Sequence, residues 1–335
     1  MGPNSIRSYV VRKDDQNRVS ANLETLSLAD LPPGDVVVQV DYSSINYKDA
    51  LAATGHPGVA PNLPHVPGID AVGQVIESSS DAFPVGAQVL INGHDFGSTA
   101  WGAWSEVCRV PADWAILQPQ GLSPEETIIL GTAGFTAAQC VAALESRGIQ
   151  PADGPIVVTG ATGGVGCFSI AILAKLGFEV TAVTGKQDQA AWLKSLGAAE
   201  VVGREVLQDE SDRPMLSRKW AGGVDAVGGV ALTTMLRQLK YGGAVAACGL
   251  AASPDLSMTV YPFILRGVAL LGIDSAWVTA ETRTEIWQRL ASDYRIDHLE
   301  RFAHYIGLAN VADVVQNMLN GQITGRTVVR INDHH

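Results

Sequence analysis

A glycine-rich turn carries the clearest chemical signal in this sequence. Residues 156–166 read IVVTGATGGVG, in which Ala161, Gly163 and Gly166 follow an A-x-G-x-x-G spacing. Small residues let the backbone turn tightly and approach a pyrophosphate, which the N–H groups and the positive end of a following helix stabilise. An apolar strand-like run leads into the turn and a helical stretch leaves it. This context favours a dinucleotide site over a tight turn without a ligand.

The end of the second predicted strand indicates which nucleotide is bound. An NAD site usually has an acid about 20 residues past the glycines, where it accepts a hydrogen bond from the ribose 2′-hydroxyl. Residues 184–186 read Thr-Gly-Lys instead, and Arg204 follows the third predicted strand. A hydroxyl and cations suit a 2′-phosphate, which an acid would repel, so the pattern favours NADP(H). Solvated surface cations are the alternative interpretation, and Asp188 keeps NAD open.

The sequence lacks a recognisable ligand set for zinc. A catalytic zinc needs about three N, S or O ligands, but Ile69 stands where a histidine would be expected in VPGID. Cys108 and Cys140 have no histidine at metal-like spacing, and no four-cysteine loop is present. Without a Lewis acid, alcohol–carbonyl interconversion is hard to support. Hydride addition to a double bond conjugated with a carbonyl is easier, because the carbonyl carries the developing charge.

Alternating elements must position these residues. From residue 156 onward, short apolar runs alternate with helical stretches at 165–176 and 187–196, each followed by a glycine. The predicted strands are 156–159, 179–183, 200–202, 224–227, 244–247 and 269–273. Such a pattern is typical of a parallel sheet covered on both faces. We therefore predict an α/β chain with a doubly wound sheet.

The flanking regions differ from this alternating region. Residues 1–120 are β-rich and irregular, with strand-like runs at 36–40, 72–76 and 88–91. Ser-Pro-Glu-Glu at 123–126 has a capping hydroxyl, a first-turn proline and an acid, which together begin a helix. After residue 296 we expect a helix at 308–320 and a strand at 327–331. These changes divide the chain into domains 1–122 and 123–296 and a C-terminal return, 297–335.

Length, charge and cysteine usage bound the class of protein. A chain of 335 residues is too long for one ordinary core, which favours two domains. Its net charge of −11 argues against nucleic-acid and anionic membrane partners. Four cysteines without C-x-x-C spacing indicate a reducing compartment, and early charged residues leave no signal-peptide core. We expect a cytoplasmic protein that acts on a small molecule.

Short motifs along nearly the whole chain resemble one enzyme family. They are SINYKDAL at 44–51, PGID at 67–70, GTAGFTA at 131–137, the glycine turn, YGG at 241–243, ACGL at 247–250, PFILR at 262–266 and GRT at 325–327. Together they resemble the zinc-independent quinone oxidoreductase branch of the medium-chain dehydrogenase/reductase superfamily, and within it the acryloyl-CoA reductase (NADPH) group. The resemblance implies a GroES-like catalytic domain completed by the C-terminal return, a Rossmann domain that binds NADP(H), and an active site in the cleft. It also implies a homodimer without zinc.

The resemblance also assigns roles to individual residues. Tyr47 would lie near the nicotinamide, supported by Asn46 and Asp49. Cofactor contacts are implied for Tyr47, Thr136, Thr162, Gly163, Gly164, Val165, Thr184, Gly185, Lys186, Arg204, Leu250, Ile264, Ser275 and Arg326. Ordinary alternatives exist: Tyr47 as a half-buried aromatic, Asp49 as a loop pin and Asp70 as a capping or ion-pair carboxylate. Leu250 and Ile264 could equally be core residues.

The resemblance gives a concrete reaction. Hydride would pass from NADPH to the β-carbon of acryloyl-CoA, and protonation of the α-carbon would give propanoyl-CoA. Tyr47 is the candidate donor or orienting group, with water also open. CoA would also need cations for its phosphates, and Lys48, Arg266 and Arg326 are the candidates, although their spacing does not single out any of them. Three alternatives remain: a quinone or enone reductase on the same fold, a zinc alcohol dehydrogenase, and a cofactor-binding protein without turnover.

Overall fold

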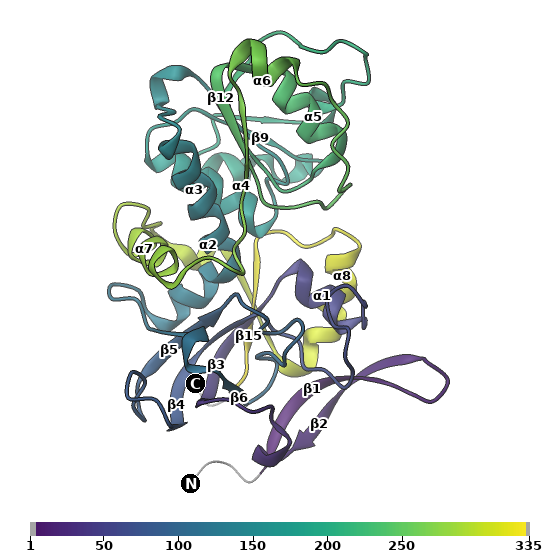
Figure 1. Cartoon of the computed structure of the whole chain (residues 1–335), viewed down its shortest axis with the longest axis vertical. Helices are drawn as coiled ribbons and strands as arrows, with labels where there is room; N and C mark the ends of the chain where they lie inside the picture. Colours follow the sequence, from purple (N-terminus) through teal and green to yellow (C-terminus); the bar gives the residue numbers. More distant parts are fainter. Residues whose placement is uncertain (1–4, 333–335) are drawn as a thin grey trace. The chain divides into compact units, whose positions relative to one another are not determined.

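The computed structural model describes residues 5–332 and divides into two compact units. The first unit contains the described residues up to Thr132, together with Ala276–Ala291 and the described residues from His298 onward. The second unit contains Ala133–Ser275 and Ser292–Asp297. Each unit has its own main sheet (Figure 1).

The first unit is built on a seven-stranded sheet in the order β14-β15-β3-β4-β5-β7, with β6 also paired to β3. These strands are β3 (Val36–Ile45), β4 (Asp70–Ser78), β5 (Gln88–Asn92), β6 (Val107–Val110), β7 (Ala115–Leu117), β14 (Ala303–Gly307) and β15 (Arg326–Arg330). The predicted strands at 36–40, 72–76 and 88–91 all lie within this sheet. Because β15 pairs antiparallel with β3, the C-terminal segment completes a sheet that the N-terminal segment begins.

A hairpin and several short helices surround this sheet. Strands β1 (Ile6–Lys13) and β2 (Val19–Leu26) pair antiparallel, and Figure 1 shows their connecting loop, in purple, extending away from the unit. The helices are α1 (Tyr47–Ala53), α7 (Ala280–Ala291) and α8 (Val311–Leu319), with 3₁₀ turns at Leu28–Asp30, Ala112–Trp114, Leu299–Phe302 and Leu308–Asn310. The predicted helix at 308–320 is confirmed as the last 3₁₀ turn and α8. Val311 and Val315, one helical turn apart, are its buried positions.

The second unit confirms the predicted doubly wound sheet. Six parallel strands follow the order β10-β9-β8-β11-β12-β13. They are β8 (Ile156–Val158), β9 (Val180–Val183), β10 (Glu200–Val202), β11 (Trp220–Asp225), β12 (Leu239–Ala247) and β13 (Ala269–Gly272). The largest differences from the predicted boundaries of this sheet are in two strands: β11 begins at Trp220 rather than at 224, and β12 begins at Leu239 rather than at 244. The strand predicted at 224–227 ends at Asp225, because the Asp225 carboxylate accepts the Gly228 N–H at 2.7 Å and begins a turn.

Helices cover both faces of this parallel sheet, as the apolar strands require. They are α3 (Gly164–Lys175), α4 (Ala190–Ser195), α5 (Gly229–Arg237) and α6 (Tyr261–Arg266), with 3₁₀ turns at Pro151–Asp153, Gln187–Gln189 and Arg204–Leu207. Val157, Val183 and Val245 share a buried cluster with Met235 of α5. Figure 1 shows α3 and α5 on opposite sides of the strands.

The helix predicted to begin after Ser123 is α2 (Pro124–Ser146). Its capping box is present, because the Ser123 N–H donates to Glu126 and the Glu126 N–H donates to Ser123 Oγ. The helix is long and apolar enough to cross a membrane, but 83% of its apolar window is buried inside the protein. Gly131 interrupts it with φ 48° and ψ −153°, values outside the helical region.

Candidate functional site

In the second unit, the glycine turn joins β8 to α3. Gly160 has φ 57°, a left-handed conformation that favours glycine. A Cβ on Gly166 would collide with the Gly160 carbonyl oxygen and lie 2.7 Å from Ala161 Cα. Because α3 begins at Gly164, its first N–H groups have no acceptor within the helix, and the helix dipole is positive there. The turn therefore fits a pyrophosphate.

All four residues expected at the pyrophosphate lie in this turn or in the first turn of α3. Thr162 is buried, whereas Gly163, Gly164 and Val165 are partly exposed. The Gly163 N–H donates to the Gly160 carbonyl at 2.8 Å, which closes the turn. The sequence pattern therefore located the turn correctly, and the positive φ at Gly160 explains why the first fingerprint position can be alanine.

The ends of β9 and β10 bring together the residues expected at a 2′-phosphate. The Thr184 N–H donates to the Val202 carbonyl, and the Lys186 N–H donates to Thr184 Oγ1 at 3.0 Å. The Arg204 guanidinium lies against Gly185, where an added Cβ would come 2.8 Å from Nε. Burial lowers the pKa of Lys186, and repulsion from Arg204 lowers it further, while Asp188 acts in the opposite direction. Two neighbouring cations and a hydroxyl suit a phosphate monoester.

The other residues expected near the cofactor come from separate elements. Leu250, after β12, and Ile264, in α6, are 64% and 73% exposed. This exposure rules out the alternative that they are core residues. Ser275 follows β13 and is partly buried, and Thr136 is buried within α2. Their contacts with a cofactor stay predictions.

In the first unit, Asn46 precedes α1 and Tyr47 is its first residue. This short helix was not predicted from the sequence. The Tyr47 side chain is 50% exposed and Lys48 is also exposed. The Asn46 N–H donates to Asp49 Oδ2 at 2.8 Å, which anchors the first turn. Tyr47 is therefore partly exposed to solvent at the start of a helix whose first turn is held by the buried Asp49 carboxylate.

Asp49 is buried completely beneath that turn. Its Oδ1 accepts the N–H groups of Gly68 and Ile69 at 3.0 and 2.8 Å. Burial, reinforced by the nearby Asp70 carboxylate, raises the pKa of Asp49 to about 7, against the lowering effect of the hydrogen bonds from Asn46 and Ile69. The carboxylate ties α1 to the loop before β4, as the loop-pin alternative expects.

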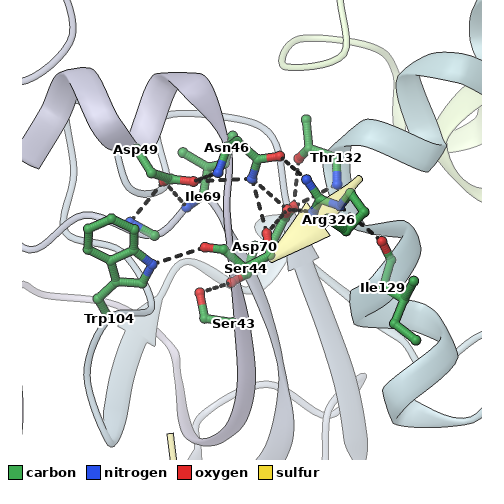
Figure 2. A network of polar contacts seen from close by, with 11 residues as sticks. Ser43, Ser44, Asn46, Asp49, Ile69, Asp70, Trp104, Ile129, Thr132 and Arg326 are labelled. Carbon is green, nitrogen blue, oxygen red and sulfur yellow. Dashed lines mark hydrogen bonds and ion pairs between the residues drawn. The ribbon is translucent and has the colours of Figure 1, made fainter. Parts of the chain in front are cut away.

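A second buried carboxylate, Asp70, is the centre of a polar network (Figure 2). Its Oδ2 accepts Ser44 Oγ at 2.6 Å and Asn46 Nδ2 at 2.8 Å. Its Oδ1 accepts the N–H and the hydroxyl of Thr132 at 2.9 and 2.6 Å. Arg326 Nη2 lies 3.5 Å from Oδ2. Asp70 is thus an ion-pair carboxylate that also joins its own strand β4 to three other segments: the end of β3 with Asn46, the helix α2 and the strand β15.

Arg326 belongs to the same network. Its Nη1 donates to Asn46 Oδ1 at 2.9 Å and its Nε donates to the Ile129 carbonyl at 3.0 Å. The side chain is buried. Arg266, in the second unit, donates instead to the carbonyls of Arg237, Leu239 and Leu216. Of the three cations considered for CoA phosphates, only Lys48 is exposed.

Sequence reasoning missed three members of this network: Ser44, Thr132 and Asp70 in its central role. All three lie within motifs that carried the family resemblance. A usable signal was present, because each polar residue adjoins an apolar strand or helix and would therefore be buried. Buried polar groups need partners, so such residues are expected to meet one another.

The described residues do not fit a zinc site. Within residues 5–332, no three His, Cys, Asp or Glu side chains gather so that they could hold a metal ion. The Ile69 N–H is bonded to Asp49, and Cys108 is buried with a pKa raised to about 12 by burial.

Comparison with known proteins matches two dehydrogenase domain families and a reductase similar along nearly its whole length. Residues 32–120 match the alcohol dehydrogenase GroES-like domain family, and residues 164–292 match the family described as zinc-binding dehydrogenase. The chain is 45% identical to acrylyl-CoA reductase AcuI of Ruegeria pomeroyi over 97% of this chain and 99% of that protein.

Solved structures agree with the sequence comparison. The yhdH oxidoreductase of Salmonella enterica in complex with NADP has a TM-score of 0.94 and 44% identity, and covers 97% of this chain and 100% of its own. Bacillus subtilis yhfP with NAD bound has a TM-score of 0.94 and 39% identity, over 98% of this chain and 100% of its own. That protein is named as a putative quinone oxidoreductase.

Proposed function

Because the chain belongs to the zinc-independent quinone oxidoreductase branch of the medium-chain dehydrogenase/reductase superfamily, alongside the acrylyl-CoA reductases, we propose that it reduces acryloyl-CoA to propanoyl-CoA with NADPH. The observation that carries this proposal is the 45% identity to an acrylyl-CoA reductase along nearly the full length of both chains. The yhdH structure with NADP supports the choice of cofactor.

The second unit supplies the residues proposed to hold NADPH. The glycine turn at residues 160–166 would bind the pyrophosphate, and Thr184, Lys186 and Arg204 would bind the 2′-phosphate. When bound, NADPH supplies the hydride that the β-carbon of the thioester accepts. Leu250, Ile264, Ser275 and Thr136 are proposed to contact the rest of the cofactor.

The first unit supplies the proposed reaction-side residues. Charge develops on the thioester oxygen as the β-carbon accepts the hydride, so a nearby donor would stabilise it. Tyr47 is the proposed donor or orienting group, and the α-carbon takes its proton from Tyr47 or from water. Asn46 and Asp49 are proposed to hold the first turn of α1, which carries Tyr47. Arg326, which belongs to the same network, is proposed to contact the cofactor.

Several further properties belong to this proposal. We propose a cytoplasmic homodimer with a catalytic domain at residues 1–122, a nucleotide-binding domain at 123–296 and a C-terminal return at 297–335. The net charge of −11 disfavours nucleic acid and anionic membranes as partners.

A second candidate is reduction of quinones or free enones. The B. subtilis relative, a putative quinone oxidoreductase 41% identical over 93% of this chain, favours it. Such a substrate needs an apolar site but no contacts to CoA phosphates. The two candidates therefore differ in acceptor and share the nucleotide site.

Steady-state oxidation of NADPH with acryloyl-CoA and with a simple naphthoquinone separates these candidates. We expect a higher kcat/KM for acryloyl-CoA. A preference for the quinone of about a hundredfold or more would reject the proposal. The same assay with NADH and with Lys186→Ala tests the cofactor: NADPH should be preferred, and the margin should collapse in the variant.

A further inference from the structure

We propose that Asp70 is a positioning residue for the proposed reduction: it fixes the side-chain amide of Asn46 and, through it, the start of α1 that carries Tyr47. The inference rests on the proposed function, since it concerns how Tyr47 is presented. It assigns a purpose to a carboxylate that the sequence pattern alone leaves as an ordinary ion-pair residue.

The surroundings of the Asn46 amide admit one orientation. Its Nδ2 lies 2.8 Å from Asp70 Oδ2, 3.1 Å from Asp49 Oδ2 and 3.1 Å from Ser44 Oγ. Its Oδ1 accepts from Arg326 Nη1 at 2.9 Å. A flipped amide would turn its oxygen toward two carboxylates and its NH₂ toward a guanidinium, both of which are repulsive. The amide is therefore held in place by charges on both sides (Figure 2).

The Asn46 main chain transmits this constraint to α1. The Asn46 N–H donates to Asp49, and the Asn46 carbonyl accepts the Ala50 N–H at 3.1 Å in the first helical hydrogen bond. Tyr47 follows directly, with half of its side chain exposed. A helix of seven residues has little intrinsic stability, so contacts such as these determine where it begins.

Asp70 itself is held by the sheet and by α2. It is the first residue of β4, and its carbonyl accepts Ser43 Oγ at 2.7 Å from the neighbouring strand β3. Thr132 donates twice to its Oδ1. Residue 131, at the break in α2, must be glycine in this arrangement, because a Cβ there would lie 2.6 Å from Asp70 Oδ2. A carboxylate fixed in this way can serve as a rigid reference for a short helix.

The test is a double-mutant cycle between Asp70→Asn and Tyr47→Phe. If Asp70 acts by positioning Tyr47, the two losses in kcat for acryloyl-CoA should not multiply. We expect each single variant to lose about tenfold or more, and the double variant to be about as slow as the slower single. Multiplying losses would overturn the proposal.

Val75→Ala, a cavity variant in the same strand β4, controls for general destabilisation. Val75 is buried in the apolar core of the first unit, five residues along β4 from Asp70. We expect it to lower the melting temperature yet to retain kcat within about threefold. If it lowers kcat as much as Asp70→Asn at an equal loss of stability, Asp70 has only a structural role and the proposal fails.

A second readout does not depend on activity. In ¹⁵N-labelled protein, the Asn46 side-chain amide should exchange its protons slowly, and Asp70→Asn should speed that exchange by about tenfold or more. Unchanged exchange in the variant would overturn the proposal even if acryloyl-CoA is reduced. If the wild-type chain reduces no acryloyl-CoA, the proposed function fails while this measurement still decides whether Asp70 fixes Asn46.

Discussion

The guanidinium of Arg204 rests on the backbone of Gly185, so closely that a methyl group there would approach Nε to 2.8 Å. This contact places a cation that lies two residues beyond β10 against a glycine that lies two residues beyond the neighbouring strand β9. Gly185 has no positive φ that would require glycine, so its lack of a side chain matters because it leaves room for Arg204, a residue proposed to bind the 2′-phosphate.

Gly185→Ala should therefore displace Arg204 and weaken NADPH selectively. We expect KM for NADPH to rise by about three- to tenfold, and KM for NADH to stay nearly constant. The measurement is the ratio of kcat/KM for the two cofactors. Lys219→Ala removes an exposed cation elsewhere in the same unit and should leave that ratio unchanged. Equal changes for NADPH and NADH would show that Arg204 does not recognise the 2′-phosphate.

Asp49 should make stability depend on pH. Its pKa is about 7 in the folded protein and 3.8 in the unfolded reference, so the folded state binds the proton more tightly. Its contribution to stability is fully present below about pH 4 and is lost as the pH rises through 7. Asp49→Asn should remove this contribution. Urea unfolding from pH 4 to 8 should show the wild type losing stability relative to the variant, and parallel profiles would contradict the assignment.

Gly131→Ala should destabilise the first unit more than an ordinary glycine substitution. The new Cβ would lie 2.6 Å from Asp70 Oδ2 and 2.9 Å from Arg326 Nη2, at a residue with φ 48°. Gly121→Ala is the matched control, because Gly121 also has a positive φ but its nearest neighbour would lie at 3.6 Å. We expect the control to cost about 1 kcal/mol and Gly131→Ala about 1–3 kcal/mol more. Thermal unfolding gives both values, and equal losses would show that the network tolerates the methyl group.

Thr132→Val should leave one oxygen of Asp70 with a single donor. The substitution keeps the shape of the side chain and the main-chain N–H, but removes the hydroxyl that donates at 2.6 Å. Because Asp70 is buried, we expect a loss of about 1–3 kcal/mol in the free energy of unfolding. Thr132→Ser should recover most of it. If serine is as destabilising as valine, lost packing rather than the hydrogen bond explains the effect.

The parallel sheet and its glycine turn could be predicted from the sequence because their signals are local. Apolar runs such as Ile156–Val158, followed by glycines and a helical stretch, indicate strand, turn and helix within about twenty residues. The proximity of two cations could also be predicted, because Lys186 and Arg204 follow strands that are neighbours in the doubly wound sheet.

The polar network could not be predicted in the same way. Asn46, Asp70, Thr132 and Arg326 are brought together only by the pairing of β3 with β4 and β15 and by the break in α2. The seven-residue helix α1 is separated from strand β3 only by Asn46 and gives almost no periodic signal. Local sequence could identify these residues as polar and close to apolar runs, but their partners depend on the tertiary fold.

The antiparallel pairing of β15 with β3 also has a consequence for biosynthesis. Every strand of the parallel sheet has left the ribosome well before residue 326 is translated, so that sheet can form during synthesis. The carboxylate of Asp70, in contrast, must wait some 250 residues for its arginine. Until then the nascent first unit carries two acids destined for burial without their cation, and solvent must hydrate them.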